Sequence, residues 1–316
     1  MREGGHGVGS AEKGSRPSFD KLRTSGSRIP LMVSLSNQER PTWAAVNKTC
    51  RVWPHMRPHH ERAIQRLVDH FSQDPTCLAV IVGGSIAKGL ERDDSDVDVM
   101  LVVTDDVFRE KWERNELGYI SADFCDYPGG YVDGKIVDLR YIQAAAERGN
   151  EPTRAAFKGA FVAHSKSEGL EEIVRKIPEY PAQETREKIQ SFYAQFECAY
   201  WYLGEAIKRS DRYLLSRAAS DVVLYGGRLI LAHNGVLYPY HKFLMTELER
   251  APEKPDDLTE LANTLLAEPN AKNAKAFYDA IKGFRFWNEA WEAWQVRYMK
   301  DTELAWLEHR AFVGDI

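Results

Sequence analysis

The chain has few cysteines, and their placement excludes two kinds of small scaffold. The four of them, Cys50, Cys77, Cys125 and Cys198, lie far apart, and no two form a CxxC pair. This spacing provides neither the paired ligands of a structural zinc site nor the dense crosslinks of a disulfide scaffold. Reduced thiols are therefore expected, which favours a cytoplasmic protein.

Long apolar runs and an excess of basic residues are also missing. No apolar run approaches the ~20 residues that a membrane-spanning helix needs, and the N-terminus lacks the apolar core of a secretory signal. The chain has 42 Lys and Arg against 47 Asp and Glu, a net charge of -5. Proteins that bind a nucleic-acid backbone usually carry a basic surplus. We therefore expect no membrane insertion, and nucleic acid is a disfavoured partner.

Residues 1–55 are expected to be a disordered extension. The opening stretch MREGGHGVGSAEKGSRPSF is rich in Gly, Ser and charge and has no apolar period. Such a segment cannot bury enough surface to offset its chain entropy. Met32 and Met56 are alternative translation starts. The chain of 316 residues can hold two ordinary domains, and we expect them at residues 56–165 and 166–316.

The pattern of residues 56–165 is typical of a small α/β domain. The apolar residues of HERAIQRLVDHFSQD recur at helical spacing. The run CLAVIV at residues 77–82 stops at two glycines, as a buried strand does on entering a tight turn. Further strands are expected at residues 96–103, in YISADFC and in KIVDLRYI, with a helix near residues 107–115. This order predicts a mixed sheet with helices.

Residues 166–316 are expected to form an all-α helical bundle. Apolar residues recur at steps of three and four from Ile189 to Ile207, from Leu214 to Leu229, and through Trp287, Trp291, Trp294 and Tyr298. Three such amphipathic stretches predict three long helices. The aromatic stripe of the third is more typical of a packed core than of a wall for ligand stacking. A homodimer interface is an alternative use of the same stripe.

The segment VGGSIAKGLERDDSDVDVMLVV carries the residues for chemistry. Gly83 and Gly84 let the backbone turn sharply and approach a phosphate without an obstructing Cβ atom. Ser85 supplies a hydroxyl where a short helix would begin, and helix N-termini favour anions. Asp96 and Asp98 lie two apart on a predicted strand, so both side chains point to one face. Together these residues suit phosphoryl-type transfer from a nucleoside triphosphate bound with Mg²⁺.

A third carboxylate is expected on a neighbouring strand. Asp138 is the first choice because the residues around it in KIVDLRYI alternate between apolar and polar, and Asp123, Asp126 and Asp133 compete with it. Two metal ions held by three carboxylates can lower the pKa of an attacking hydroxyl and neutralise a leaving pyrophosphate. Arg140 would share the face of Asp138 and meet substrate or triphosphate. A salt bridge to a carboxylate is the alternative for Arg140, and Lys88 is expected to be a solvated surface residue.

The sequence GGSIAKG followed by DDSDVDV closely resembles the signature of the DNA polymerase β-like nucleotidyltransferase superfamily. The helical half looks like that of the kanamycin nucleotidyltransferase-like and minimal nucleotidyltransferases. The resemblance covers about residues 60–142 and is only general beyond them. It implies metal binding by Asp96 and Asp98, a third carboxylate at Asp138, and contact of the triphosphate with Gly84 and Ser85.

A second segment resembles part of these helical domains. HNGVLYPYHKFL is similar to a helix end and turn from which a lysine can face the active site and contact nucleotide phosphates. The resemblance points to Lys242 for this role. The alternative is an ordinary exposed lysine after a Tyr-Pro-Tyr turn.

The residues and the resemblance predict the transfer of a nucleoside monophosphate from a nucleoside triphosphate to an acceptor hydroxyl, with release of pyrophosphate. ATP is the first choice of donor, so AMP is the group transferred. A small cationic acceptor such as an aminoglycoside-like compound suits the acidic balance of the chain. A protein acceptor, as in AMP-transferring toxin–antitoxin partners, is an alternative, and an RNA 3′ end is disfavoured by charge. A catalytically silent nucleotide-binding module is the alternative from another class. The acidic pair argues against it, because neighbouring carboxylates repel one another without a metal.

Overall fold

The computed structural model of the chain describes residues 53–289 and 293–308. These residues all belong to one unit, residues 52–316. The extension predicted at residues 1–55 lies outside the described residues except for its last three positions. The domain boundaries predicted from the sequence stay predictions. Among the described residues, no helix combines the length and the apolar character that crossing a membrane would require.

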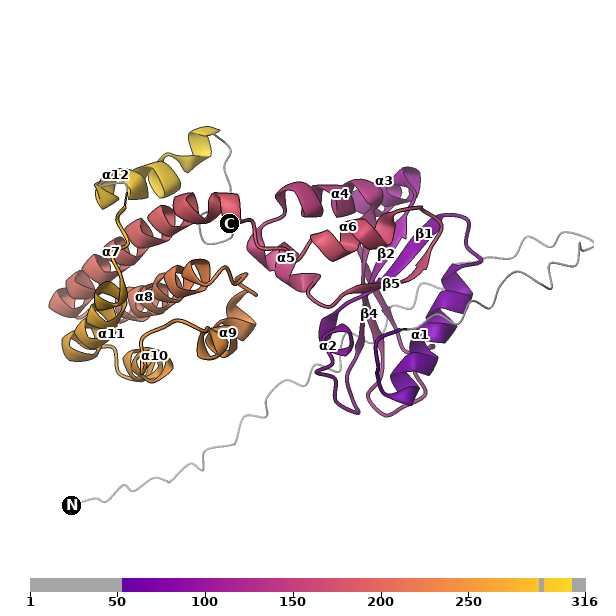
Figure 1. The fold of residues 1–316 in the computed structure, drawn as a ribbon, viewed down its shortest axis with the longest axis horizontal. Helices are drawn as coiled ribbons and strands as arrows, with labels where there is room; N and C mark the ends of the chain where they lie inside the picture. The colour runs from indigo at the N-terminus through magenta and orange to yellow at the C-terminus, as the bar shows by residue number, and fades with distance from the viewer. Residues whose placement is uncertain (1–52, 290–292, 309–316) are drawn as a thin grey trace, which may run out of the picture. The chain divides into compact units, whose positions relative to one another are not determined.

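The first half of the described chain is built on a mixed five-stranded sheet with the strand order β3-β4-β2-β1-β5 (Figure 1). The strands are β1 (Cys77–Val82), β2 (Val97–Val103), β3 (Gly118–Ser121), β4 (Val132–Asp138) and β5 (Phe161–Ser165). β2 and β4 are parallel, whereas the other neighbouring pairs are antiparallel. The prediction of an α/β domain with a mixed sheet is confirmed, and β5 is a strand that the sequence patterns did not indicate.

Helices cover both faces of this sheet. On one face, α1 (Pro58–Phe71) packs Ile64 and Leu67 against strand residues such as Val80. On the other face, α4 (Leu139–Arg148) and α6 (Leu170–Lys176) contribute Ile142 and Val174 to a second cluster. The remaining helices of this half are α2 (Gly84–Ala87), α3 (Asp105–Glu113) and α5 (Glu151–Ala156). Successive side chains of β1 and β2 point to opposite faces of the sheet and nearly all are buried, so each face has its own core.

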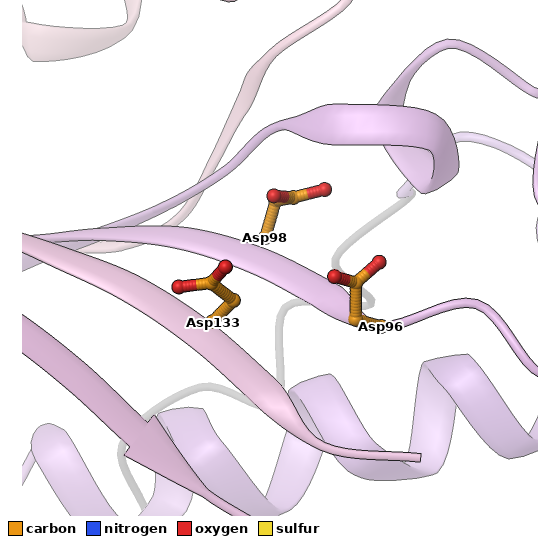
Figure 2. A group of neighbouring side chains, drawn as sticks. All are labelled: Asp96, Asp98 and Asp133. Atoms are coloured by element: carbon orange, nitrogen blue, oxygen red, sulfur yellow. The ribbon is translucent and has the colours of Figure 1, made fainter. Parts of the chain in front are cut away.

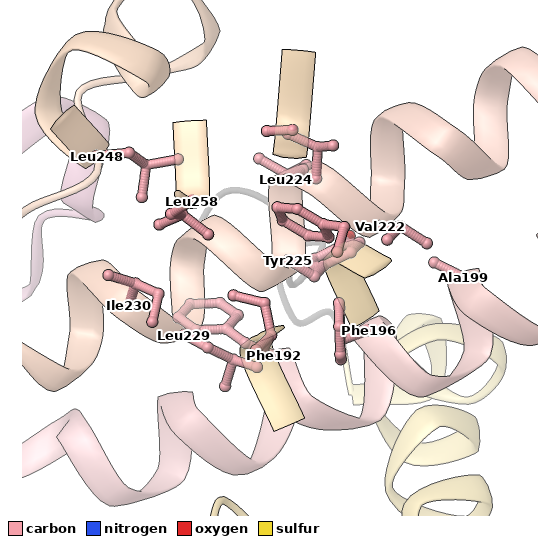
Figure 3. Packing of buried hydrophobic residues seen from close by; sticks show 14 of the residues in the cluster. Phe192, Phe196, Ala199, Val222, Leu224, Tyr225, Leu229, Ile230, Leu248 and Leu258 are labelled. Carbon is pink, nitrogen blue, oxygen red and sulfur yellow. The ribbon is translucent and has the colours of Figure 1, made fainter. Parts of the chain in front are cut away.

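The second half is helical, as predicted. Two long helices, α7 (Thr185–Arg209) and α8 (Arg212–His233), pack along each other and carry the core shown in Figure 3. Shorter helices complete the bundle: α9 (Leu244–Arg250), α10 (Leu258–Ala267), α11 (Ala271–Phe284) and α12 (Trp294–Tyr298). Single turns lie at η2 (Ala182–Glu184), η3 (His241–Phe243), η4 (Met299–Glu303) and η5 (Ala305–Glu308).

The third long helix, expected from Trp287 to Tyr298, is not formed as predicted. Helix α11 ends at Phe284, and the next residue, Arg285, has an extended backbone with φ of -158°. Trp287 follows in an irregular segment, is only 2% exposed, and donates its Nε1–H to the carbonyl of Ile281 at 2.8 Å. The aromatic residues therefore belong to separate segments, since Trp287 packs beside α11 whereas Trp294 and Tyr298 lie in α12, which packs against α7. Trp291 lies outside the described residues. Trp287 is a core residue, and a homodimer stays a prediction.

A buried ion cluster joins α5 to the helical half. Glu151 is 1% exposed, and its Oε1 lies 3.2 Å from Nζ of Lys188 and 3.4 Å from a guanidinium nitrogen of Arg228. Its Oε2 accepts the backbone N–H of Tyr238 at 2.7 Å. The guanidinium of Arg228 lies over the rings of Phe192 and Tyr238, 4.1 and 4.3 Å from their centroids. Buried charges need such partners, so this cluster ties the sheet domain to the bundle.

Candidate active site

Three carboxylates meet where β2 and β4 begin. Asp98 in β2 lies directly opposite Asp133 in β4, because the two strands pair in parallel register. Asp96 is the residue before β2. Ligand oxygens of all three lie within 4.8 Å of one another, and Figure 2 shows the side chains gathered at one place. Carboxylate oxygens at this spacing fit the oxygen ligands that Mg²⁺ prefers in proteins. We call these residues the acidic triad.

Hydrogen bonds within the loop before β2 position Asp96 beside the other two carboxylates of the triad. Ser95 is buried, and its hydroxyl accepts the backbone N–H of Arg92 at 2.9 Å. The Ser95 carbonyl accepts the hydroxyl proton of Tyr127 at 2.8 Å. Tyr131 lies beside Asp96, whose negative charge raises the pKa of the Tyr131 hydroxyl. Both hydrogen bonds of Ser95 therefore fix the loop that carries Asp96.

The glycine turn is built around Asp98. Gly84 has φ of 65°, and a Cβ atom at this position would lie 1.7 Å from Oδ2 of Asp98. The backbone N–H of Gly83 donates to the carbonyl of Asp98 at 2.9 Å. The predicted short helix is present as α2, with Ser85 half-buried in its first turn and Gly89 at φ of 65° beyond its end. A side chain at position 84 would thus displace a carboxylate of the triad.

The clustered negative charges of the triad favour the binding of a cation. Burial raises the pKa of Asp98, and the negative charges of Asp96 and Asp133 raise it further. Lys88 and Lys242 lower the same pKa by their positive charge. Like charges held this close favour either a bound proton or a bound metal ion. The residues present therefore fit a divalent cation.

Two lysines from distant parts of the chain lie near this acidic group. The ammonium groups of Lys88 and Lys242 lie 5.9 and 5.2 Å from the centroid of the Phe243 ring. Both charges act on Asp98. The phosphate contact of Lys242 stays a prediction. Lys88 is exposed, as the sequence predicts, but its charge also acts on Asp98. Its position one helical turn after Gly84 is the signal that could have identified it, because residues four apart share a helix face.

Asp138 does not belong to the triad, and the prediction that it is the third carboxylate is wrong. It pairs with Val103 at the other end of β4, five residues from Asp133, which corresponds to about 17 Å along a strand. It also faces the opposite side of the sheet, because successive side chains alternate. Its Oδ1 accepts the backbone N–H of Tyr141 at 2.8 Å and caps α4. The strand begins at Val132, so Asp133 and not Asp138 comes level with Asp98.

The other acidic and basic alternatives lie away from the triad as well. Arg140 is in the first turn of α4, where its Nε lies 2.8 Å from Oδ2 of Asp138, so the salt-bridge alternative holds and the expected triphosphate contact does not. Asp126 pairs with Arg62 and Arg66 at 3.2 and 2.9 Å.

A family model for the nucleotidyltransferase domain matches residues 64–159. The chain therefore carries a nucleotidyltransferase domain. The match extends from within α1 to the segment before β5, includes the whole acidic triad, and supports the polymerase β-like superfamily. Among solved structures, this chain is similar to a nucleotidyltransferase-like protein from Exiguobacterium sibiricum 255-15, with 11% identity over 79% of this chain and 80% of that one and a TM-score of 0.44. No curated protein matches the chain.

Proposed function

We propose that this nucleotidyltransferase domain transfers AMP from ATP to an acceptor hydroxyl and releases pyrophosphate. The observation that carries the proposal is the acidic triad, Asp96, Asp98 and Asp133, gathered within the matched domain. These carboxylates would hold Mg²⁺, which when bound neutralises charge on the triphosphate and lowers the pKa of the attacking hydroxyl. The chain's own groups would bind, orient and deprotonate the reactants.

The triphosphate is proposed to lie between the glycine turn and the two lysines. Ammonium groups suit phosphate oxygens as compact charges, and those of Lys88 and Lys242 are close enough to influence Asp98. Gly83 and Gly84 present backbone without side chains, and Ser85 offers a hydroxyl to a phosphate oxygen. Replacing either lysine by Met should raise KM for ATP about tenfold, the loss of one charged hydrogen bond, with a smaller effect on kcat.

Asp133 is proposed to accept the proton of the acceptor hydroxyl. It is the exposed member of the triad, whereas Asp96 and Asp98 are half-buried. In the balanced reaction, a bond forms between the acceptor oxygen and the α-phosphorus, and the bond from that phosphorus to pyrophosphate breaks. A positioned carboxylate that takes up the proton contributes as a general base.

The acceptor is proposed to be a small hydroxylated molecule, with an aminoglycoside-like compound as one example. A hydroxyl on a protein is the alternative, as is a silent module that binds nucleotide without transfer. The net charge of -5 supports an acceptor other than nucleic acid. The free thiols of Cys77, Cys125 and Cys198 support our proposal of a cytoplasmic location.

A thermal-shift titration with ATP, GTP, CTP and UTP, with and without Mg²⁺, tests the nucleotide site. We expect a Mg²⁺-dependent rise in Tm that Asp96→Asn abolishes and that Asp256→Asn keeps. Asp256 is an exposed loop residue and provides a matched loss of one charge. No rise with any nucleotide in a folded sample would refute the proposed transfer, whereas a rise without any transfer of label in the next experiment would favour the silent module.

Incubation with α-labelled ATP and cell lysate then identifies the class of acceptor. Label in the small-molecule fraction supports the proposal, and label in the protein fraction favours the alternative. Asp133→Asn should abolish the labelling.

A further inference from the structure

A cavity of about 560 Å³ opens in the helical half, lined by residues of α8, η3, α9 and α10. Much of its lining is apolar and includes Leu224 of α8, Leu244 and Met245 of α9, and Leu266 of α10. Leu224 and Leu244 are buried, whereas Leu266 is 41% exposed and forms part of the rim. A cavity of this size and character is typical of a small-molecule site.

One polar group in this lining lacks a partner. Tyr225 is 3% exposed and belongs to the core of the bundle (labelled in Figure 3). Within the described ranges, its hydroxyl makes no hydrogen bond. Burial raises the pKa of Tyr225, and the charge of Asp221 raises it further, so the hydroxyl keeps its proton at neutral pH. Buried tyrosine hydroxyls usually have a partner, and a ligand in the cavity could supply one.

The charges around the cavity are compensated. Among the described residues of the lining, Asp221 is the only carboxylate, and its Oδ2 lies 2.7 Å from Nε of Arg217, which lines the same cavity. His241 completes the lining and shares a hydrogen bond with the hydroxyl of Tyr238 through Nδ1, at 2.9 Å. A cationic ligand would find no unpaired carboxylate here. The lining therefore suits an uncharged molecule with an apolar body.

One wall of the cavity contacts the nucleotidyltransferase domain. His241 and Leu244 line the cavity, and the ring of Phe243, which lies between them in the chain, is 5.9 Å from Nζ of Lys88, the residue after α2. Glu247 of α9 lies 3.5 Å from Nζ of Lys158 in the segment before β5. The η3 and α9 wall of the cavity is therefore the part of the helical half that approaches the glycine turn.

We infer that this cavity binds the acceptor of the transfer reaction, an uncharged amphipathic small molecule whose apolar part contacts Leu224, Leu244 and Leu266 and whose polar part accepts a hydrogen bond from Tyr225. The inference rests on the proposed function and narrows its acceptor. Within the proposed class of small hydroxylated acceptors it favours a neutral compound over a polycationic one such as an aminoglycoside, because the charges of the lining are paired with one another. A free hydroxyl of this bound molecule would be the group that receives AMP.

NMR of protein labelled with ¹³C at the methionine methyl groups tests this directly. The Met245 signal, assigned with Met245→Leu, reports on the cavity, and the Met100 and Met299 signals are references outside it. The probes are octyl β-D-glucoside below its micellar concentration and the polyamine spermine. We expect a saturable shift of the Met245 signal with the glucoside and none with spermine.

Variants connect the shift to the lining. Tyr225→Phe keeps the ring and removes only the hydroxyl, so the apparent Kd for the glucoside should rise about two- to tenfold. Tyr213→Phe is the matched control, since Tyr213 lies on the same helix and is 80% exposed. Leu266→Gln at the exposed rim should also weaken binding, and it is a second test if Tyr225→Phe fails to fold.

Any one of four results would overturn the inference. The first three are an unmoved Met245 signal, an equal response to spermine, and unchanged glucoside binding by both Tyr225→Phe and Leu266→Gln. Equal shifts at Met100 and Met299 would mean non-specific binding and would also overturn it. The Mg²⁺-ATP thermal shift, measured on the same samples, separates the two proposals. Its absence in the wild type refutes the proposed function, whatever the cavity binds.

Discussion

Exchanging single carboxylates along β4 tests our proposal that Asp133, and not Asp138, is the third metal ligand. Asp133 faces Asp98 across the parallel pair, whereas Asp138 caps α4 about 17 Å farther along the strand. Asn at either position keeps the size of the side chain and removes one negative charge. The two variants therefore test the register of β2 against β4, because that register decides which carboxylate of β4 lies opposite Asp98.

The sizes of the expected effects follow from these surroundings. Mg²⁺-ATP at about a hundred times its Kd stabilises the native state by ~2.7 kcal/mol, which corresponds to a rise in Tm of roughly 5–11 °C for a chain of this size. Asp133→Asn should lose most of this rise. Asp138→Asn should keep it, because Asn also caps helices well. Its baseline Tm should fall only slightly, because Arg140, the partner that loses its charge pair, is largely exposed and water screens the pairing.

Differential scanning fluorimetry with and without Mg²⁺-ATP measures both quantities on the same samples. Circular dichroism confirms that each variant is folded before ligand is added. A normal rise for Asp133→Asn together with a lost rise for Asp138→Asn would refute the assignment of the triad.

Three further predictions concern the glycine turn, the buried ion cluster and the metal-free site. Gly84→Ala places a Cβ atom 1.7 Å from Oδ2 of Asp98 and should lower kcat/KM, measured by pyrophosphate release, about a hundredfold. The Tm should fall as well, because Ala at φ of 65° is strained. Glu151→Gln leaves Lys188 and Arg228 buried without their shared carboxylate, so the free energy of unfolding in urea should fall by about 3 kcal/mol. Without metal, the folded protein holds the proton of Asp98 more tightly than the unfolded chain does, because its pKa is raised above the ordinary 3.8. This contribution to stability is full below pH 3.8 and is lost as the pH rises through the folded pKa. Asp98→Asn should remove that fall, and Mg²⁺ should mask it in the wild type.

Local features of this protein follow from the sequence alone. The residue pattern predicts the turn at Gly83 and Gly84, the acidic pair at Asp96 and Asp98, the strand at residues 77–82 and the helical second half. Each depends on side-chain periodicity or turn chemistry within a few residues of chain. The scattered cysteines likewise exclude a disulfide scaffold and a structural zinc site, because neither can be built without closely spaced ligands or pairs.

The tertiary structure decided which distant groups meet. Asp133 replaces Asp138 because β4 starts at Val132 and pairs in parallel with β2. Lys88 and Lys242 act on the same carboxylate although one follows α2 of the sheet domain and the other lies in η3 of the helical half. Alternating side chains allow a strand several registers, and only burial and pairing across the whole domain select one. The sequence therefore determines the glycine turn and the acidic pair, while strand register and helix packing determine the third carboxylate, the second lysine and the cavity of the helical half.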